Sequence, residues 1–435
     1  MPVLSKSLKR ISKLPQQWGI SLVALRKQSW WSQIKAGAPD PIFSVTEAYR
    51  ADANPQKVLL GVGAYRTDEG MPFILPCVQR AKDMLGEQKL DHEYLPQGGY
   101  SEFNRAAARL ALGEESDVLK NGLNLTVQAL GGTGAIRLGM TFLSRFHTGC
   151  KVVYIPNPTW NNHKNISLNS GMEWKFYKYY DPEQKGMNFC GMCEDIENIP
   201  EKSIILFHAI AHNPTGFDPS PDQWKRLSNL CMERNLQDRL ERQCALYHKM
   251  FTGFATGDAE KDASSVRQFI EDGHQVAVAQ SFSKNMGLYG ERIGALTLVT
   301  TSKEELERVN SQMKIVIRAM YSNPPLYGAR IVSQVLNEQA LRCQWLKDIQ
   351  GMANRIQSVR QLLVAELKKV GSEKNWEHIC KQIGMFSFTG LNKEQVEKLT
   401  KEHSVYLTAD GRISVASLGG KNIPYVARAI HEVSK

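Results

Sequence analysis

One short stretch of the chain combines residue types that can bind and activate a carbonyl compound. It is the run SFSKNMGLYGER, residues 281–292, in which Lys284 follows two small hydroxyls and precedes Arg292. A lysine amine removed from water can condense with an aldehyde to form a Schiff base. Hydroxyl and guanidinium groups beside it can hold a phosphate. The run therefore suits a ligand with both groups, such as pyridoxal phosphate, although an ordinary exposed lysine after a strand is an equally simple interpretation.

A second candidate anion site lies at residues 131–134, where the sequence is GGTG. An apolar run at residues 125–130 predicts a strand, and the residues after the glycines predict a helix. Free backbone N–H groups at a helix N-terminus, together with the helix dipole, attract a phosphate. The spacing matches neither the dinucleotide-binding nor the P-loop fingerprint. The simplest NAD and ATP functions are therefore excluded.

Other polar and aromatic residues follow the ends of further predicted strands. Trp160 comes after a strand at residues 151–156, and an aromatic ring there can stack on a flat cofactor. Asn213 lies in a tight-turn sequence after a strand at residues 203–207 and can direct its amide at a ring oxygen. Arg412 follows a turn and can pair bidentately with a carboxylate, or it is an ordinary surface arginine.

These residues must be positioned by alternating strands and helices. Apolar runs near residues 125, 152, 203 and 275, separated by helical stretches, predict an α/β fold with a doubly wound sheet whose strands carry ligands at their carboxyl ends. Residues 302–370 are expected to be mostly helical, with a break at residues 321–325. The remainder predicts α+β structure, with a helix near residues 393–401 and a pair of strands near residues 405–407 and 412–415.

Charge and composition limit the classes of function. The 435 residues carry a net charge of +10, but residues 1–35 hold seven Lys or Arg and no acid, which leaves about +3 elsewhere. No nucleic-acid partner is expected, because the body has no basic cluster with interleaved aromatics. No apolar run is long enough to span a membrane. Eight scattered cysteines predict neither disulfides nor a metal site, and the Cys190–Cys193 pair has no second pair at zinc spacing.

The leading residues have a composition of their own. Residues 1–28 are basic, rich in serine, free of acids and loosely amphipathic, which is typical of a mitochondrial transit segment. A disordered basic arm is the alternative, since Pro15 interrupts the helical pattern. Trp30 and Trp31 follow, and two adjacent tryptophans are expected to dock on the body of the chain or on a partner subunit.

Together these motifs resemble the aspartate aminotransferases, which are fold-type I pyridoxal-phosphate enzymes, and the mitochondrial form more than the cytosolic. The resemblance runs from residue 29 to residue 435 and rests on the segments LGVGAYR, EYLPQGG, GGTGA, PTWNNH, HAIAHNPTG, SFSKNMGLYGER, RAMYSNPP, GMFSFTGL and DGRISVA. It implies a large domain at residues 74–351, with a mixed, mostly parallel sheet flanked by helices. It also implies a smaller α+β domain at residues 41–73 and 352–435, and a dimer arm at residues 29–40.

The resemblance implies roles for individual residues. Lys284 binds the pyridoxal phosphate covalently and later moves a proton. The phosphate is held by Gly132, Thr133, Ser281 and Arg292, together with Tyr94 of the neighbouring subunit. Trp160 stacks on the pyridine ring, and Asn213 binds its phenolic oxygen. The substrate-binding residues are Gly63, Trp160, Asn213, Phe386, Arg412 for the α-carboxylate, and Arg318 of the neighbour for the distal carboxylate.

The implied activity is amino transfer between aspartate and 2-oxoglutarate, by a homodimer with shared active sites in the mitochondrial matrix. Its partners would be small dicarboxylic amino and keto acids. Arg318 disfavours an aromatic-specific aminotransferase. The two carboxylates of such substrates suit two arginines.

One segment, residues 237–252, departs from the family pattern. The family has there a buried strand with an aspartate that keeps the pyridine nitrogen protonated and, three residues later, a tyrosine that donates to the phenolic oxygen. Here Leu240, Cys244 and Tyr247 recur at helical spacing and predict a helix instead. Counting back from the glycine at 253 places His248 in the aspartate position and Phe251 in the tyrosine position.

The loss of both groups leaves two hypotheses open. Asp238, Glu241 and Tyr247 are nearby residues that could replace the missing pair. Without a carboxylate beside it, the pyridine nitrogen has a lower pKa and the ring is a poorer electron sink. The chain is therefore expected to be either an active transaminase or a catalytically impaired or inactive homologue that binds cofactor or a partner.

Overall fold

The computed structural model of the chain describes residues 29–37, 40, 42–233 and 244–435. The predicted transit segment, residues 1–28, lies outside the described residues. So do Asp238 and Glu241, two of the candidates for the missing catalytic groups.

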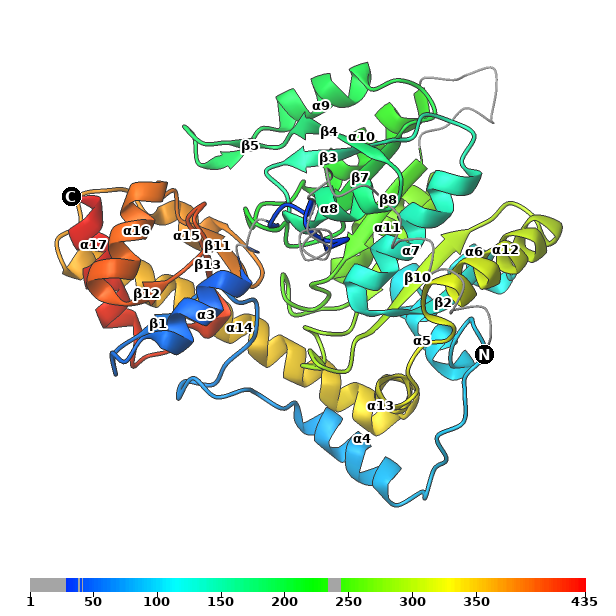
Figure 1. Cartoon of the computed structure of the whole chain (residues 1–435), viewed down its shortest axis with the longest axis horizontal. Coiled ribbons are helices and arrows are strands. Elements are labelled where there is room, and N and C mark those ends of the chain that lie inside the picture. The colour runs from blue at the N-terminus through cyan, green and yellow to red at the C-terminus, as the bar shows by residue number, and fades with distance from the viewer. Residues whose placement is uncertain (1–28, 38–39, 41, 234–243) are drawn as a thin grey trace, which may run out of the picture.

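A seven-stranded sheet forms the centre of the molecule (Figure 1). Its strands, in spatial order, are β2 (Asn124–Leu130), β10 (Ile293–Val299), β9 (Val276–Ser281), β8 (Cys244–Lys249), β7 (Ile204–His208), β3 (Val152–Asn157) and β4 (Glu173–Lys178). Strand β10 is antiparallel to both neighbours, and the other adjacent pairs are parallel. The mixed, mostly parallel α/β sheet that the sequence predicts is confirmed.

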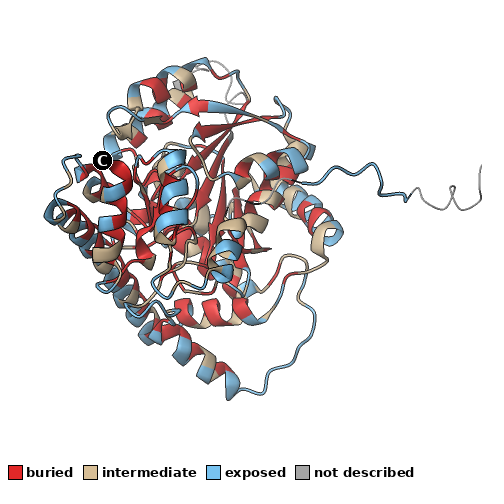
Figure 2. Ribbon diagram, turned by 60° about the vertical axis from the view of Figure 1, so that its left-hand side comes forward, coloured by how far each residue is buried: buried red, intermediate tan, exposed pale blue. Residues whose placement is uncertain are grey.

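Helices cover both faces of this sheet. On one face, α7 (Gly131–Phe146) and α12 (Lys303–Tyr321) pack with strand residues such as Leu206 and Leu246. On the other face, α9 (Phe189–Asn198), α10 (Pro221–Glu233) and α11 (Ser264–Glu271) pack with Phe207 and Tyr247. Because successive strand residues point to opposite faces, both of which are covered, the inner strands are buried along nearly their whole length (Figure 2).

Strand β8 corrects one prediction. The helix expected across residues 237–252 is wrong for its described part, because residues 244–249 form a strand that pairs with β7 and β9. Residues 237–243 lie outside the described part of the chain. A parallel strand buried on both faces needs no alternation of apolar and polar residues. The helical spacing of its apolar residues was therefore misleading.

A second group of elements gathers at one end of the long helix α14 (Gln339–Lys369), on the left in Figure 1. It contains α3 (Phe43–Ala51), α15 (Glu377–Lys381), α16 (Lys393–His403) and α17 (Ile423–Ser434). Strand β1 (Val58–Leu59) pairs with β12 (Val405–Tyr406), and β11 (Phe386–Phe388) pairs with β13 (Arg412–Ser414). The two strands predicted near 405 and 412 exist, but their predicted mutual pairing is wrong, since each pairs with a strand from elsewhere in the chain.

The remaining elements connect these groups. They are α4 (Pro76–Gly86), α5 (Ser101–Leu112), α6 (Asp117–Lys120), α8 (Asn162–Asn169), β5 (Tyr180–Asp181), β6 (Gly186–Met187) and α13 (Tyr327–Asn337). Helix α12 begins at a Ser302 cap whose hydroxyl accepts from the Glu305 N–H, and it ends at Ser322, which has a φ of +68°. The predicted helical run and its break near residue 321 are thus confirmed.

Two findings concern the surface. No helix among the described residues is long and apolar enough to cross a membrane. Trp30 and Trp31 are 97% and 74% exposed, so the tryptophan pair does not pack against the body of its own chain.

Candidate active site

Ten of the twelve residues singled out from the sequence line one cavity of about 520 Å³. The cavity lies where β9 ends and α7 begins, and β11 and β13 contribute to its wall. The ten are Gly63, Gly132, Thr133, Trp160, Asn213, Ser281, Lys284, Arg292, Phe386 and Arg412. The strand ends thus bring together the residues that the sequence placed after separate strands, as expected for an α/β sheet.

Lys284 lies three residues after the end of β9, with its amine at the cavity. Its Nζ donates to the carbonyl oxygen of Gly63 and lies 4.9 Å from the centre of the Tyr289 ring. Burial, the largest cause, and the cations Arg412 and Arg292 together lower the pKa of Lys284 to about 7. A large fraction of this amine is therefore uncharged at neutral pH, which is the nucleophilic form.

One end of the cavity is built to hold an anion. The first turn of α7 brings Gly132 and Thr133 to the cavity, where backbone N–H groups have no partner within the helix. The Arg292 guanidinium lies close by and donates through Nη1 to Ser283 Oγ over 3.3 Å and to the Tyr289 carbonyl over 2.9 Å. Helix dipole and guanidinium both favour a phosphate at this end.

The other end presents a buried guanidinium. Arg412 is 4% exposed, and its Nη1 donates to Asn213 Oδ1 over 3.1 Å while its Nη2 donates to the Gly61 carbonyl over 2.8 Å. Its guanidinium carbon lies 4.2 Å from the centre of the Phe386 ring. Burial lowers the pKa of Arg412 to about 10, so the group remains charged at neutral pH. A fixed and charged guanidinium is a suitable partner for a carboxylate.

Gly63 allows the backbone to approach the reactive amine closely. A Cβ at this position would lie 2.5 Å from Phe386 Cζ and 3.5 Å from Lys284 Nζ. A larger residue would therefore push into the ring and narrow the cavity at the lysine.

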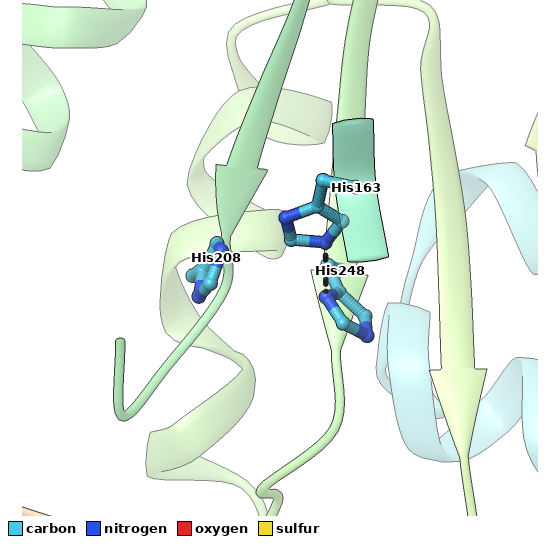
Figure 3. A group of neighbouring side chains, drawn as sticks. All are labelled: His163, His208 and His248. Atoms are coloured by element: carbon cyan, nitrogen blue, oxygen red, sulfur yellow. Dashed lines mark hydrogen bonds between the residues drawn. The ribbon is translucent and has the colours of Figure 1, made fainter. Parts of the chain in front are cut away.

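The aspartate position of the family is occupied by His248, the penultimate residue of β8. Its ring lies 5.5 Å from the Trp160 ring, centre to centre, and its Nδ1 is 2.9 Å from His163 Nε2. Figure 3 shows His248 together with His163 of α8 and His208 of β7. The three side chains are buried, and burial holds the pKa of each imidazole well below its usual value, to about 3 for His208.

The tyrosine position holds Phe251, which packs edge-on against Phe386 at 5.7 Å and carries no hydroxyl. Tyr247 does not replace it. That residue is fully buried on the α10 and α11 face of the sheet, and its hydroxyl donates to the Ser265 carbonyl over 3.5 Å. Tyr247 and His248 are adjacent on one strand, so they point to opposite faces.

Two predicted residues lie outside the cavity. Tyr94 is 86% exposed, and Arg318 is an exposed residue near the end of α12 whose guanidinium donates to Ser322 Oγ. Neither belongs to the lining of the cavity in its own chain.

Several residues of the site were missed in the sequence. Thr159 and His163 lie in the PTWNNH segment, and His208 begins the HAIAHNPTG segment, yet only the tryptophan and asparagine of these segments were singled out. Of the residues not singled out, Met250 lines the cavity. Thr159, His163 and His208 had an available signal, since each follows a predicted strand at the ligand-binding edge. Met250 had none, because the sequence predicted a helix across residues 237–252.

These residues fit pyridoxal phosphate at two of its three polar ends. The amine of Lys284 suits the aldehyde, and the start of α7 with Arg292 suits the phosphate. The close approach of Gly132 to Ser281, where an added Cβ would lie 2.9 Å from the serine Cβ, leaves the backbone open at the phosphate end. At the ring-nitrogen end the chain offers an imidazole in place of the carboxylate implied by the resemblance.

Comparison with known proteins agrees with this geometry. A family model described as "Aminotransferase class I and II" matches residues 55–430. The chain belongs to that family. It is 52% identical over 410 residues to the mitochondrial aspartate aminotransferase of Gallus gallus, a match that covers 94% of this chain and 95% of that protein. The resemblance drawn from the sequence motifs is confirmed.

Solved structures of family members have the same fold. The aspartate aminotransferase from the cytoplasm of Saccharomyces cerevisiae is 40% identical with a TM-score of 0.89, over 93% of this chain and 98% of that chain. An aromatic-amino-acid aminotransferase from Burkholderia pseudomallei, covalently bound to pyridoxal phosphate, is 39% identical with a TM-score of 0.89, over 94% of this chain and 100% of that chain. The fold-type I transferase architecture is therefore confirmed.

Proposed function

We propose that the chain is an aspartate transaminase, which uses pyridoxal phosphate to convert L-aspartate and 2-oxoglutarate to oxaloacetate and L-glutamate. The observation that carries this function is one cavity that joins the perturbed amine of Lys284, the anion-binding start of α7 and the buried guanidinium of Arg412. Named aspartate aminotransferases of 52% and 40% identity support it. Nothing in the family comparison supports the alternative of an inactive homologue.

The residues around the cavity have separate tasks. When bound, pyridoxal phosphate supplies an aldehyde and an electron-withdrawing ring. Gly132, Thr133, Ser281 and Arg292 would hold its phosphate, while Trp160 would stack on the ring and Asn213 would bind the phenolic oxygen. Lys284 would hold the cofactor at its aldehyde, and in its free, uncharged form its Nζ would take the proton from the substrate Cα. Arg412 would orient the substrate α-carboxylate beside Gly63 and Phe386.

The proposal is tested with purified protein. Addition of pyridoxal phosphate should produce the absorption band of a lysine-bound cofactor, and addition of aspartate should remove that band as oxaloacetate forms. Lys284→Ala protein should bind the cofactor without producing the band. Absence of any band with the unchanged chain would contradict the assignment. Comparison of aspartate with phenylalanine as donors separates this function from an aromatic aminotransferase.

The exposure of Tyr94 and Arg318 supports a homodimer with shared sites. In this arrangement Tyr94 would complete the phosphate site of the other subunit, and Arg318 would bind the distal carboxylate of its substrate. Residues 29–40, with the exposed Trp30 and Trp31, would form an arm that packs on the partner. Burial of two tryptophans removes a large apolar area from water.

Subunit mixing tests the shared site. Lys284→Ala and Arg318→Ala proteins should each be nearly inactive with aspartate as homodimers. A mixed dimer contains one site with an intact Lys284 and an intact partner arginine, so mixing should restore activity. If Arg318 serves its own subunit, no mixture regains activity.

The domain division and the location follow from the same resemblance. Residues 74–351 would form the large cofactor-binding domain, and residues 41–73 with 352–435 would form the small domain. The basic composition of residues 1–28 and the mitochondrial relatives support import into the mitochondrial matrix. Import into isolated mitochondria should be lost when residues 1–28 are removed.

A further inference from the structure

A series of hydrogen bonds leads through three buried histidines to one unpartnered nitrogen of His248. Figure 3 shows the three histidines and the bond between His163 and His248. The series starts at the backbone N–H of Asn213, which donates to His208 Nδ1 over 3.1 Å. His208 Nε2 lies 3.3 Å from the Thr159 hydroxyl, which lies 2.8 Å from His163 Nδ1. His163 Nε2 is in turn 2.9 Å from His248 Nδ1.

The direction of every hydrogen bond in this series follows from the first one, between Asn213 and His208. A backbone N–H can only donate, so His208 Nδ1 accepts and the proton of a neutral His208 resides on Nε2. That N–H donates to the Thr159 hydroxyl, whose own proton then points to His163 Nδ1. A neutral His163 therefore carries its proton on Nε2.

The last bond fixes the tautomer of His248. The Nε2–H of His163 donates to His248 Nδ1, so the proton of a neutral His248 is on its Nε2. The surroundings keep the imidazoles neutral: they are buried, and two arginines, Arg292 and Arg412, line the adjacent cavity. Burial holds the pKa of each ring low, and neighbouring histidines also lower the pKa of His163 and His248.

The last group in this series of hydrogen bonds, the Nε2–H of His248, is a donor without an acceptor. His248 Nε2 is buried and has no hydrogen-bond partner among the described residues. In Figure 3 it points away from His163. Trp160, whose ring packs against that of His248, and Met250, two residues after His248 in the sequence, both line the cavity. A buried N–H without a partner is costly, so a ligand acceptor at this place would be favoured.

We propose that His248 donates a hydrogen bond from Nε2 to the pyridine nitrogen of pyridoxal phosphate and holds that nitrogen unprotonated. The proposal rests on the proposed function and deepens it. His208, Thr159 and His163 act as positioning residues, because they fix the His248 tautomer that can donate. The polarity at the ring nitrogen is the reverse of that given by a carboxylate, which accepts a hydrogen bond from a protonated nitrogen.

The same three imidazoles could instead hold a divalent metal, since their ligand atoms lie within 4.8 Å of one another. The structure favours the hydrogen-bonded chain. The group contains no carboxylate, the nearby cavity is lined by two arginines, and the facing nitrogens of His163 and His248 already bond to each other. A dication would enter this site without a neutralising charge.

Nitrogen NMR of the bound cofactor tests the proposal directly. The protein is loaded with pyridoxal phosphate labelled with ¹⁵N in the ring, because the resonance of an unprotonated pyridine nitrogen is well separated from that of a pyridinium. We expect the resonance of the loaded, unchanged protein at the unprotonated position at neutral pH. A resonance at the pyridinium position would overturn the proposal, and this measurement needs no variant.

Variants then examine the origin of the effect. His248→Asp supplies a carboxylate acceptor and should move the resonance to the pyridinium position. Thr159→Val removes the hydroxyl link, so the His163 and His248 tautomers are no longer fixed, and the resonance should shift part of the way. The matched control is His431→Asp on α17, remote from the cavity, which should leave the resonance unchanged. An unmoved resonance in His248→Asp would contradict the role of His248.

Two further results separate this proposal from its rivals. If the unchanged protein forms no absorption band with pyridoxal phosphate, the proposed function fails. If the band forms but the ring nitrogen is protonated, only the role of His248 fails. Stoichiometric zinc that stays with the loaded protein after dialysis against zinc salt would also overturn the hydrogen-bonded chain.

Discussion

Two lysines at the ends of neighbouring strands show how different the meaning of a buried amine can be. Lys249 ends β8 and pairs in register with Gln280 of β9, and Lys284 follows β9. Burial is the main cause that lowers the pKa of both amines to about 7. However, Lys284 lines the cavity and donates to Gly63, whereas Lys249 is 0% exposed and its Nζ has no hydrogen-bond partner among the described residues.

The difference shows that a perturbed pKa alone does not locate an active site. The further causes of the low pKa of Lys284 are Arg412 and Arg292, which also line the cavity. Lys249 instead lies among Asp262 and Glu260, which raise its pKa, and Arg267, which lowers it. Access to a ligand makes an uncharged amine reactive, while an enclosed amine only reduces stability.

Loss of the two amines should affect activity very differently. Lys284→Ala should lower the rate of aspartate transamination on the order of 10⁴-fold, because the group that transfers the proton is removed. Lys249→Met should keep activity within about twofold, since the amine faces no ligand. Both rates are measured by coupled detection of oxaloacetate. A comparable loss in both variants would show that the enclosed amine of Lys249 is also needed for activity.

Replacement of the enclosed Lys249 should stabilise the folded protein. Lys249→Met removes a buried amine with a depressed pKa and keeps the apolar volume, so at pH 7 it should raise the free energy of unfolding by roughly 2 to 4 kcal/mol. Urea unfolding followed by circular dichroism measures the difference. Leu246→Met, on the same strand, controls for the effect of a methionine side chain and should not stabilise the protein.

The gain from Lys249→Met should depend on pH with a defined sign. The pKa of Lys249 is about 7 in the folded chain and 10.5 in a freely solvated lysine, so the unfolded state binds more protons between these values. Stability of the unchanged protein therefore rises as pH increases from about 7 to 10. The difference in free energy of unfolding between the variant and the unchanged protein should be full at pH 7 and shrink towards pH 10. A difference independent of pH would mean that Lys249 titrates normally.

The smallest expected effect is a change in the pKa of Lys284 when a neighbouring arginine is removed. Arg412→Gln removes the largest electrostatic cause of the low pKa, but burial, the larger contribution, remains. The pKa of Lys284 in cofactor-free protein should therefore rise above 7 while staying below its ordinary value. It is measured from the pH dependence of labelling by an amine-directed reagent, with the modified residue located by mass spectrometry. Lys249 should remain unlabelled in the same experiment.

Much of the fold followed from local patterns. Strands β2, β3, β7 and β9 are short apolar runs next to turn signals, and all four were predicted close to their observed bounds. Strand β8 was missed because burial on both faces removes the alternation that marks a half-buried strand. The partners of β12 and β13 were also missed, since pairing between segments far apart in sequence leaves no local signal.

The site was predictable to the extent that its residues follow strands. Lys284, Trp160 and Asn213 occupy such positions, and the structure brings all three to one cavity. The sequence also placed His248 where the family has an aspartate. It gave no indication that His163 and Thr159 would bond in series with it, because those contacts depend on how α8 packs over the strand ends.

The sequence by itself determined the family, and it predicted the lysine at the cavity and the groups at its two ends, because each is specified by residue type and by position after a strand. Only the tertiary structure decided which buried lysine faces a ligand and which way the histidine chain donates. Both depend on contacts between distant segments, such as Lys284 with Gly63, 221 residues apart, and His163 with His248, 85 residues apart. Such contacts form when the sheet and its helices pack together, and no local pattern encodes them.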